Sequence, residues 1–146
     1  MNNTIFADLT KESLLARADD ARLRSYSPYS GYSVGAALLC ADGKIFTGCN
    51  IENAAFSPTN CAERTAFFKA ISVGEKEFKA IAVVGNKKGA LPETWEFCTP
   101  CGVCRQVMLE FVNPDEFLIY SGKGKEIRTF TLKELLPESF APSMVN

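Results

Sequence analysis

The stretches Cys61-Ala62-Glu63 and Pro100-Cys101-Gly102-Val103-Cys104 decide how this chain is interpreted. Together they offer three thiols, which are three of the four ligands that a tetrahedral zinc ion takes, and they leave the fourth position open for water. Zinc lowers the pKa of bound water, and a nearby carboxylate can move that water's protons. The pattern therefore predicts a hydrolytic site with one Zn²⁺ per chain, with Cys61, Cys101 and Cys104 as ligands and Glu63 as proton shuttle.

Each part of this pattern also has a simpler explanation. Cys61 can be a small buried side chain, and a Cys-x-x-Cys pair can serve thiol redox chemistry instead of metal binding. A carboxylate in the first turn of a helix is common because it complements the helix dipole. Residues two apart do not share a helix face, so Glu63 is poorly placed as a fourth ligand. At the start of a helix, however, it can lean over the open position of the metal.

Two expected helix starts and two arginines favour thiolates at this site. Cys61 and Cys101 should lie at the mouths of two helices, whose free N–H groups and partial positive charge stabilise anionic sulfur. Arg64 is expected to donate to a ligand sulfur and to offset the negative charge of three thiolates. Arg105 either does the same or lies on the surface.

The composition is that of an ordinary globular protein. The chain has 146 residues, of which 47% are apolar and 23% charged, and its net charge is -1. We therefore expect one domain over residues 1–146. No run of lysine or arginine is dense enough to track phosphates, which counts against a nucleic-acid polymer as partner. The chain has no histidine, which excludes histidine general bases and histidine-containing zinc motifs.

The first residues and the cysteines indicate the compartment. The stretch Met1–Asp8 lacks the charged and apolar regions of a secretion signal, and no apolar run is long enough to span a bilayer. Six cysteines in a chain without such a signal favour metal-bound or free thiols over disulfides. These features predict a cytoplasmic protein with no membrane partner.

The hydrophobic pattern predicts an α/β fold. Helices are expected at about Thr10–Arg24, Cys61–Val73, Cys101–Val112 and Leu132–Leu136, the second of them capped by Thr59 or Asn60. Strands are expected at Val34–Leu39, Lys44–Gly48, Phe78–Val84, Phe117–Tyr120 and Ile127–Phe130, with turns at Asp42-Gly43 and Gly122-Lys123-Gly124. This order predicts a three-layer α/β/α sandwich on a five-stranded mixed sheet.

The segments Tyr26–Ala70 and Thr99–Val107 closely resemble the small cytidine deaminases of nucleoside salvage. Cys-Ala-Glu followed by Pro-Cys-x-x-Cys is highly specific in that context, and three cysteines with a glutamate that is not a ligand form a zinc deaminase layout. The resemblance implies a cytidine deaminase-like fold. It also implies zinc-dependent hydrolytic deamination of cytidine and 2′-deoxycytidine to the uridines, with release of ammonia.

The resemblance also assigns residues to the nucleoside. Asn50 and Glu52 match positions that hydrogen-bond the ribose hydroxyls, and an amide with a carboxylate suits a neutral sugar and repels a phosphate. The backbone N–H of Ala62 is expected to contact the pyrimidine carbonyl. The Thr99 carbonyl is expected to meet the leaving amine, because a residue before proline is held extended.

Two aromatic residues and one long segment are expected to lie near the nucleoside pocket. By the resemblance, Tyr32 and Phe140 would pack against the base, with core packing as the alternative for either ring. Tyr32 stands where phenylalanine is usual, so its hydroxyl needs a partner. The segment Ala90–Cys98 is longer than the usual link into Pro-Cys, and it adds Trp95 and Cys98 near the site.

The family resemblance further implies a homotetramer in which neighbouring subunits complete each active site. The apolar tail ending at Phe140 is compatible with this, because such a tail at the surface needs a cover. Phe67 and Phe68 cannot share one helix face, so one is expected to face the core and the other a partner. The alternative is a monomer that folds the tail over its own surface.

Two other functions remain open from the residues alone. A related zinc deaminase could act on another aminopyrimidine or on a polynucleotide, although polynucleotide deaminases tend to place a helix where Gly122-Lys123-Gly124 predicts a hairpin. The chain could also be a structural-zinc or thiol-redox module. A structural zinc would need a fourth protein ligand, for which the candidates are Cys40, Cys49 and Cys98.

Overall fold

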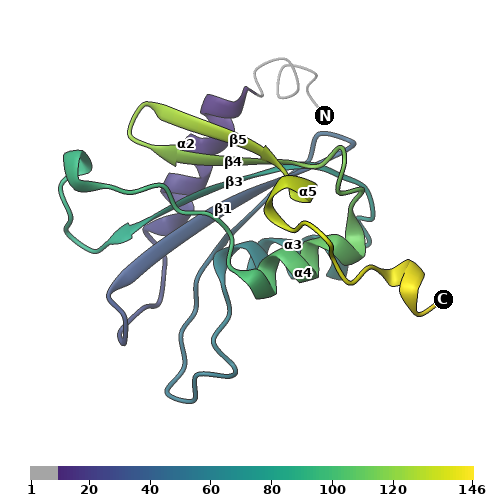
Figure 1. Ribbon diagram of the computed structural model, residues 1–146. Coiled ribbons are helices and arrows are strands. Elements are labelled where there is room, and N and C mark those ends of the chain that lie inside the picture. The colour runs from purple at the N-terminus through teal and green to yellow at the C-terminus, as the bar shows by residue number, and fades with distance from the viewer. Residues whose placement is uncertain (1–9) are drawn as a thin grey trace.

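A five-stranded sheet organises the computed structural model, which describes residues 10–146. The strands are β1 (Tyr32–Cys40), β2 (Ile45–Cys49), β3 (Phe78–Lys87), β4 (Leu118–Lys123) and β5 (Glu126–Thr131). They lie in the order β2-β1-β3-β4-β5 (Figure 1). β3 and β4 are parallel, and the other neighbouring pairs are antiparallel. The predicted mixed sheet is confirmed.

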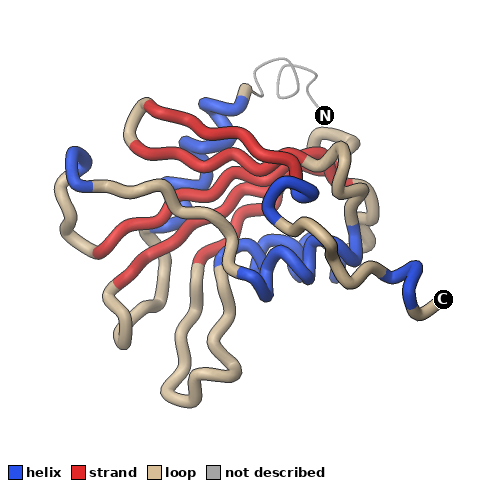
Figure 2. Tube along the Cα trace, in the orientation of Figure 1, coloured by secondary structure: helices blue, strands red, loops and turns tan. Residues whose placement is uncertain are grey.

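Helices cover both faces of this sheet. α2 (Lys11–Arg22) packs on one face, while α3 (Ala62–Ser72) and α4 (Gly102–Phe111) pack on the other (Figures 1 and 2). The short α5 (Leu132–Leu135) contacts α4, and two 3₁₀ turns, η1 (Pro92–Thr94) and η2 (Pro142–Met144), lie in connecting and C-terminal segments. The predicted three-layer α/β/α sandwich is therefore confirmed. Among the described residues, no helix is long and apolar enough to cross a bilayer.

Large side chains fill the layer between the sheet and α3. Phe67 is fully buried there, and its ring centroid lies 5.1 Å from that of Phe78 and 5.9 Å from that of Phe117. Burying one such ring stabilises the fold by roughly 1.5–3 kcal/mol. Phe68, its neighbour in the chain, is 47% exposed, so one of the two adjacent rings faces the core and the other does not.

Two glycines let the helix backbones approach the sheet closely. A Cβ at Gly35 in β1 would lie 1.9 Å from the carbonyl oxygen of Ala18 in α2. A Cβ at Gly48 in β2 would lie 2.4 Å from the carbonyl oxygen of Ala62 and 2.6 Å from the nitrogen of Ala66. Because neither position has room for a side chain, the first turn of α3 rests directly on β2.

The predicted cap of α3 is wrong. Neither Thr59 nor Asn60 caps this helix, and Cys61 itself occupies the N-cap position without a side-chain capping bond. The Thr59 hydroxyl instead accepts a hydrogen bond from the Asn53 N–H at 3.2 Å, and the Asn60 amide donates to the Thr65 hydroxyl at 3.1 Å. Both side chains stabilise the loop before the helix.

Two strand boundaries also differ from the expectation. β3 continues past Val84 to Lys87, because its last residues pair with the beginning of β1. The turn between β4 and β5 lies at Gly124 and Lys125, where Gly124 has a φ of 59° that favours glycine. The antiparallel pairing of the last two strands is confirmed.

Candidate active site

Three thiols meet where α3 and α4 begin. Cys61 is the N-cap of α3, Cys101 is the N-cap of α4, and Cys104 lies in the first turn of α4. Their sulfur atoms all lie within 4.8 Å of one another, and the Cys61 and Cys101 sulfurs are 3.7 Å apart. Zinc–sulfur bonds of about 2.3 Å in tetrahedral geometry place two sulfurs about 3.8 Å apart. The donor set therefore fits a zinc ion.

One arginine brings positive charge to these sulfurs. The guanidinium of Arg64 donates to the Cys61 sulfur at 3.2 Å. Hydrogen bonds from the Cys104 thiol and from Arg64 lower the pKa of Cys61 to about 5, against the opposing effect of burial. The pKa of Cys104 is raised, first by its hydrogen bond to Cys61 and then by burial. A divalent cation among the sulfurs would take the place of their protons.

Arg105 has neither of the two roles expected for it. Its side chain points back along the chain, where Nε donates to the Pro100 carbonyl at 2.7 Å and Nη1 donates to the Leu135 carbonyl at 2.6 Å. Nη2 lies 3.4 Å from the Thr99 hydroxyl. Arg105 therefore joins the segment before α4 to the end of α5.

Glu63 lies beside the thiols in a dry environment. It is only 3% exposed, and it occupies the first turn of α3, directly after the Cys61 N-cap. Burial raises the pKa of its carboxyl group to about 7, with a further contribution from the charge on Cys61. A carboxyl group that titrates near neutral pH can both accept and donate a proton during a reaction.

Cys40 belongs to a different cluster. It lies within reach of Asp42 and Glu75, three groups that could in principle hold a metal ion. However, the ammonium of Lys44 is 2.9 Å from the Glu75 carboxylate and 3.5 Å from that of Asp42. Because that ammonium already pairs with both carboxylates, we assign no metal to this cluster.

The two remaining cysteines also lie outside the group of three. The Cys49 thiol donates to the Arg24 carbonyl at 3.4 Å. Cys98 lies against β3, where a Cβ at Gly85 would come within 2.8 Å of its sulfur. Since all six cysteines lie in the described part of the chain, the structure offers no fourth thiol to the group at α3 and α4. A zinc ion held by the three thiols would therefore keep one coordination position for water, as hydrolytic chemistry requires.

Asn50 is largely committed to the fold. Its side-chain oxygen accepts hydrogen bonds from the Ser25 hydroxyl and from the Val34 N–H, the latter at 2.9 Å. Its amide nitrogen donates to the Tyr32 carbonyl at 2.8 Å. One amide hydrogen is left for a ligand.

Glu52 lies in a cavity of about 330 Å³, which is lined by Tyr29, Ser30, Glu52, Asn53, Phe56 and Thr59. Its carboxylate accepts hydrogen bonds from the Tyr29 and Ser30 N–H groups at 3.0 and 3.1 Å. The Ser30 hydroxyl also donates to it and is the main cause of a lowered pKa at Glu52. Sequence reasoning missed the supporting serines, whose only signal is their place between α2 and β1.

The other expected contacts lie at the ends of elements. Ala62 is the first residue of α3, where backbone N–H groups have no partner inside the helix. Thr99 stands directly before Pro100, and its carbonyl accepts no hydrogen bond from residues 10–146. Phe140 is 63% exposed, and its carbonyl accepts a hydrogen bond from the Gln106 amide at 2.9 Å. The chain by itself therefore does not cover the Phe140 ring.

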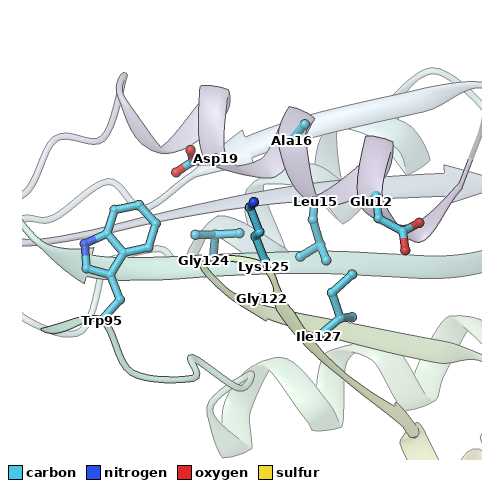
Figure 3. A pocket seen from close by; sticks show the side chains of 10 residues that line it. Glu12, Leu15, Ala16, Asp19, Trp95, Gly122, Gly124, Lys125 and Ile127 are labelled. Atoms are coloured by element: carbon cyan, nitrogen blue, oxygen red, sulfur yellow. The ribbon is translucent and has the colours of Figure 1, made fainter. Parts of the chain in front are cut away.

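Trp95 lies away from the thiols, contrary to the expectation. It lines a cavity of about 440 Å³ between α2 and the β4–β5 hairpin (Figure 3). Its ring packs with the α2 side of the core, and the Arg22 guanidinium lies 5.0 Å from its centroid. The long segment before α4 thus crosses from one face of the sheet to the other, and only Cys98 reaches the site.

Comparisons with known proteins agree with this geometry. Residues 9–120 match the sequence profile of the cytidine and deoxycytidylate deaminase zinc-binding region. A cytidine deaminase of Sporosarcina psychrophila is 48% identical over 130 residues, which cover 89% of this chain and 90% of that protein. A cytidine deaminase of Halalkalibacterium halodurans is 44% identical over 138 residues, covering 94% and 99%.

A solved structure of a cytidine deaminase is also similar to this chain. The crystal structure of cytidine deaminase from Burkholderia pseudomallei superposes with a TM-score of 0.80 at 43% identity, covering 90% of this chain and 100% of that one. Both the sequence and the fold are thus matched over nearly their full length. With its three thiols and buried glutamate in place, this chain belongs to the cytidine deaminase family, hydrolases that act on carbon–nitrogen bonds.

Proposed function

We propose that this protein hydrolyses cytidine and 2′-deoxycytidine to uridine and 2′-deoxyuridine, releasing ammonia, as a step of pyrimidine salvage. One observation carries the proposal. The Glu63 carboxyl group is buried beside three thiols whose spacing fits one zinc ion with an open position. Membership of the family supports the choice of a cytosine nucleoside over other aminopyrimidines.

Glu63 moves the protons in this reaction. Zinc, when bound by Cys61, Cys101 and Cys104, supplies an acidified water and offsets the negative charge that develops on the substrate. Glu63 takes one proton from the attacking water and gives it to the ring nitrogen next to the amino-bearing carbon. It then takes the remaining proton of the added hydroxyl group and passes it to the amine, so that the carbon–nitrogen bond breaks, ammonia leaves and the added oxygen becomes the carbonyl oxygen of the product. A pKa of about 7 suits a group that must both accept and donate.

Backbone groups at the two helix starts orient the base. The Ala62 N–H points from the open end of α3 and can donate to the pyrimidine carbonyl. The unpaired Thr99 carbonyl can accept from the amine as it departs. Ala62 directly follows Cys61, and Thr99 stands two residues before Cys101. The groups that orient the base therefore lie close to the thiols that would hold the metal.

The loop before α3 holds the sugar. Glu52, kept ionised by its hydrogen bonds to Ser30 and Tyr29, accepts from a ribose hydroxyl. The remaining amide hydrogen of Asn50 donates to the same sugar. A carboxylate at this place repels a phosphate, which favours a nucleoside over a nucleotide or a nucleic-acid polymer.

A direct assay tests this function. We expect the ultraviolet absorbance of cytidine to fall when the purified protein is added, with equimolar ammonia released. A strong chelator should abolish the change, and added Zn²⁺ should restore it. A zinc-loaded protein that leaves both nucleosides unchanged would contradict the proposal and favour a structural zinc module.

We also propose that the active protein is a homotetramer with shared active sites. Exposed apolar side chains lie on the elements that carry the site, including Phe56 at 80%, Phe68 at 47%, Val103 at 57% and Phe140 at 63% exposure. Such surfaces need a cover in water. Light scattering should report four chains, and a chain ending at Ser139 should lose activity, whereas a chain ending at Ala141 should keep it. A fully active monomer at assay concentration would contradict this assembly.

A cytoplasmic location is a further part of the proposal. All six cysteines are free thiols, which suits a reducing compartment. Cell fractionation followed by the cytidine assay would test this location.

A further inference from the structure

Three successive carbonyl groups lead into α4. The carbonyl of Cys98 accepts a hydrogen bond from the Ser121 hydroxyl at 2.7 Å. The carbonyl of Pro100 accepts one from Arg105 Nε, also at 2.7 Å. The Thr99 carbonyl between them accepts none among the residues that the structure describes. Two side chains thus hold the carbonyls on either side of the one assigned to the leaving amine.

Ser121 belongs to the core of the sheet. It is fully buried in β4, where it lies opposite Val83 of β3 on one side and Arg128 of β5 on the other. Strands of the core open only when most of the fold does. The Ser121 hydroxyl therefore holds the Cys98 carbonyl at a fixed place.

The side chain of Cys98 also has little room to move. Its sulfur and the Tyr32 ring both lie against Gly85, where a Cβ would come within 2.8 Å of the sulfur and 3.0 Å of Cε1 of the ring. The Tyr32 hydroxyl donates to the Gly85 carbonyl at 3.1 Å, which supplies the partner that this hydroxyl needs. Cys98 is thus held by its packing as well as by its carbonyl.

The Arg105 guanidinium is fixed at a second point. Its Nη1 donates to the carbonyl of Leu135 at 2.6 Å, at the end of α5, and α5 has a complete capping box at Thr131. A guanidinium presents its donors in a rigid planar fork. Once Nη1 is held at Leu135, the direction of Nε is set as well, and Nε meets the Pro100 carbonyl.

The peptide group between these two anchors has little freedom left. Thr99 stands before a proline and is therefore held extended, and the ring of Pro100 fixes its own φ. The Thr99 carbonyl can turn only if the bond at Cys98 or the bond at Pro100 is given up. Pro100 is fully buried, whereas Thr99 is exposed, so a ligand can approach Thr99.

We propose that Ser121 and Arg105 are positioning residues that aim the Thr99 carbonyl at the departing amine. The proposal rests on the function proposed above. Each residue acts through a carbonyl next to Thr99 and not on the substrate itself. The amine gains a proton from Glu63 before it leaves, and a charged donor makes a stronger hydrogen bond than a neutral one. A well-aimed carbonyl therefore stabilises the reacting state more than the bound substrate.

Steady-state kinetics with cytidine test these two residues. Ser121→Ala and Arg105→Gln should each lower kcat roughly three- to tenfold, the effect of one hydrogen bond, with KM nearly unchanged. The double variant should lose less than the product of the two single losses, because both changes release the same carbonyl.

A second nucleoside separates aiming from general support of the site. Pyrimidin-2-one ribonucleoside is cytidine without its amino group, so it offers no amine to the Thr99 carbonyl. Its inhibition constant should be the same in both variants as in the unmodified protein. A disturbance of the whole site would instead weaken its binding together with kcat.

Ser33→Ala is the matched control. Ser33 is also a buried serine in a strand, and its hydroxyl donates to the Asn86 carbonyl at 3.2 Å, but it contacts Arg22 of α2 on the other face of the sheet. Its kcat should equal that of the unmodified protein. Zinc content and thermal unfolding should show that the variants bind metal and fold. Because Ser121→Ala keeps the link to α5, it decides the test if Arg105→Gln does not fold.

The opposite results are equally clear. Unchanged kcat or lost zinc in Ser121→Ala would overturn the positioning role while leaving the deaminase activity of the unmodified protein intact. Losses that multiply in the double variant, a loss confined to KM, or an inhibition constant that rises as kcat falls would overturn it too. An unmodified, zinc-loaded protein that leaves cytidine unchanged would instead contradict the proposed function itself.

Discussion

The α-helices in residues 10–146 begin in two different ways. α2 starts at Thr10, whose hydroxyl accepts from the Ser13 N–H at 3.1 Å, and α5 starts at Thr131 with a complete capping box to Glu134. α3 and α4 start at Cys61 and Cys101, and neither has a side-chain capping bond. The first pair of helices has caps that stabilise the helix, and the second pair has thiols.

This difference separates stability from chemistry. Replacing a good N-cap by a residue that cannot cap lowers stability by about 1 kcal/mol. α3 and α4 each lack that stabilisation. The N–H groups and the partial positive charge of those starts instead remain available to anionic sulfur and to a ligand. If the two kinds of helix start divide these tasks, substitutions at the thiol starts should change metal binding and turnover, and those at the capped starts should change stability.

The largest effect is expected at the metal. Cys104→Ser should reduce the zinc content from about one per chain to almost none and abolish turnover, because two thiols hold zinc poorly. Cys98→Ser should retain its zinc, since Cys98 lies outside the group of three sulfurs. Metal analysis after dialysis measures both. The reverse pattern would move the metal site away from the start of α4.

The second effect is expected at the first turn of α3. Glu63→Gln should bind zinc and fold normally but lose at least roughly 100-fold in kcat, as removal of a general acid–base group does. Glu12 is the matched control, because it is an exposed carboxylate in the first turn of the capped helix α2. Glu12→Gln should keep full activity. Ordinary turnover in Glu63→Gln would show that the first turn of α3 has no more part in catalysis than the first turn of α2.

A smaller effect is expected in the loop that leads to α3. Glu52→Gln should lower kcat/KM for cytidine by roughly tenfold or more, because hydrogen bonds to a charged group are strong. Cytosine, which lacks the sugar, should be a poor substrate for both proteins. If cytosine reacted as well as cytidine, the loop would have no part in sugar binding.

The smallest effect is expected at the capped helix. Thr10→Ala should lower the free energy of unfolding by about 1 kcal/mol and leave kcat and zinc content unchanged. Thr10→Ser keeps a capping hydroxyl and should lie within a few tenths of a kcal/mol of the unmodified protein. Urea denaturation measures the difference. A change in turnover in either variant would show that the start of α2 is not purely structural.

Much of the fold could be predicted from local patterns. The apolar spacing in α2 and the run Val34–Leu39 located a helix and a buried strand, because each pattern repeats with the period of one element. The end of β3 could not be located in this way. Asn86 and Lys87 are polar and join the sheet only because Ser33 and Tyr32 lie opposite them.

The grouping of the three thiols was predictable from the sequence, but the contacts that support them were not. Cysteine spacing pointed to the three thiols, since few other arrangements use that pattern. The roles of Asn50 and Arg105 depend on partners distant in sequence, such as Tyr32 for Asn50 and Leu135 for Arg105. The rule that Ser, Thr, Asp or Asn begins a helix failed at α3, because a position that favours capping is used there for sulfur.

Gly48 is a position outside the reacting groups at which the protein should not tolerate substitution. It has no functional group, yet a Cβ there would collide with the first turn of α3 at Ala62 and Ala66. In a library of all single substitutions selected for deamination, we expect this edge-strand glycine to be as strictly kept as the cysteines. A search for active-site residues by chemistry alone would pass over it, while a map of mutational tolerance would include it.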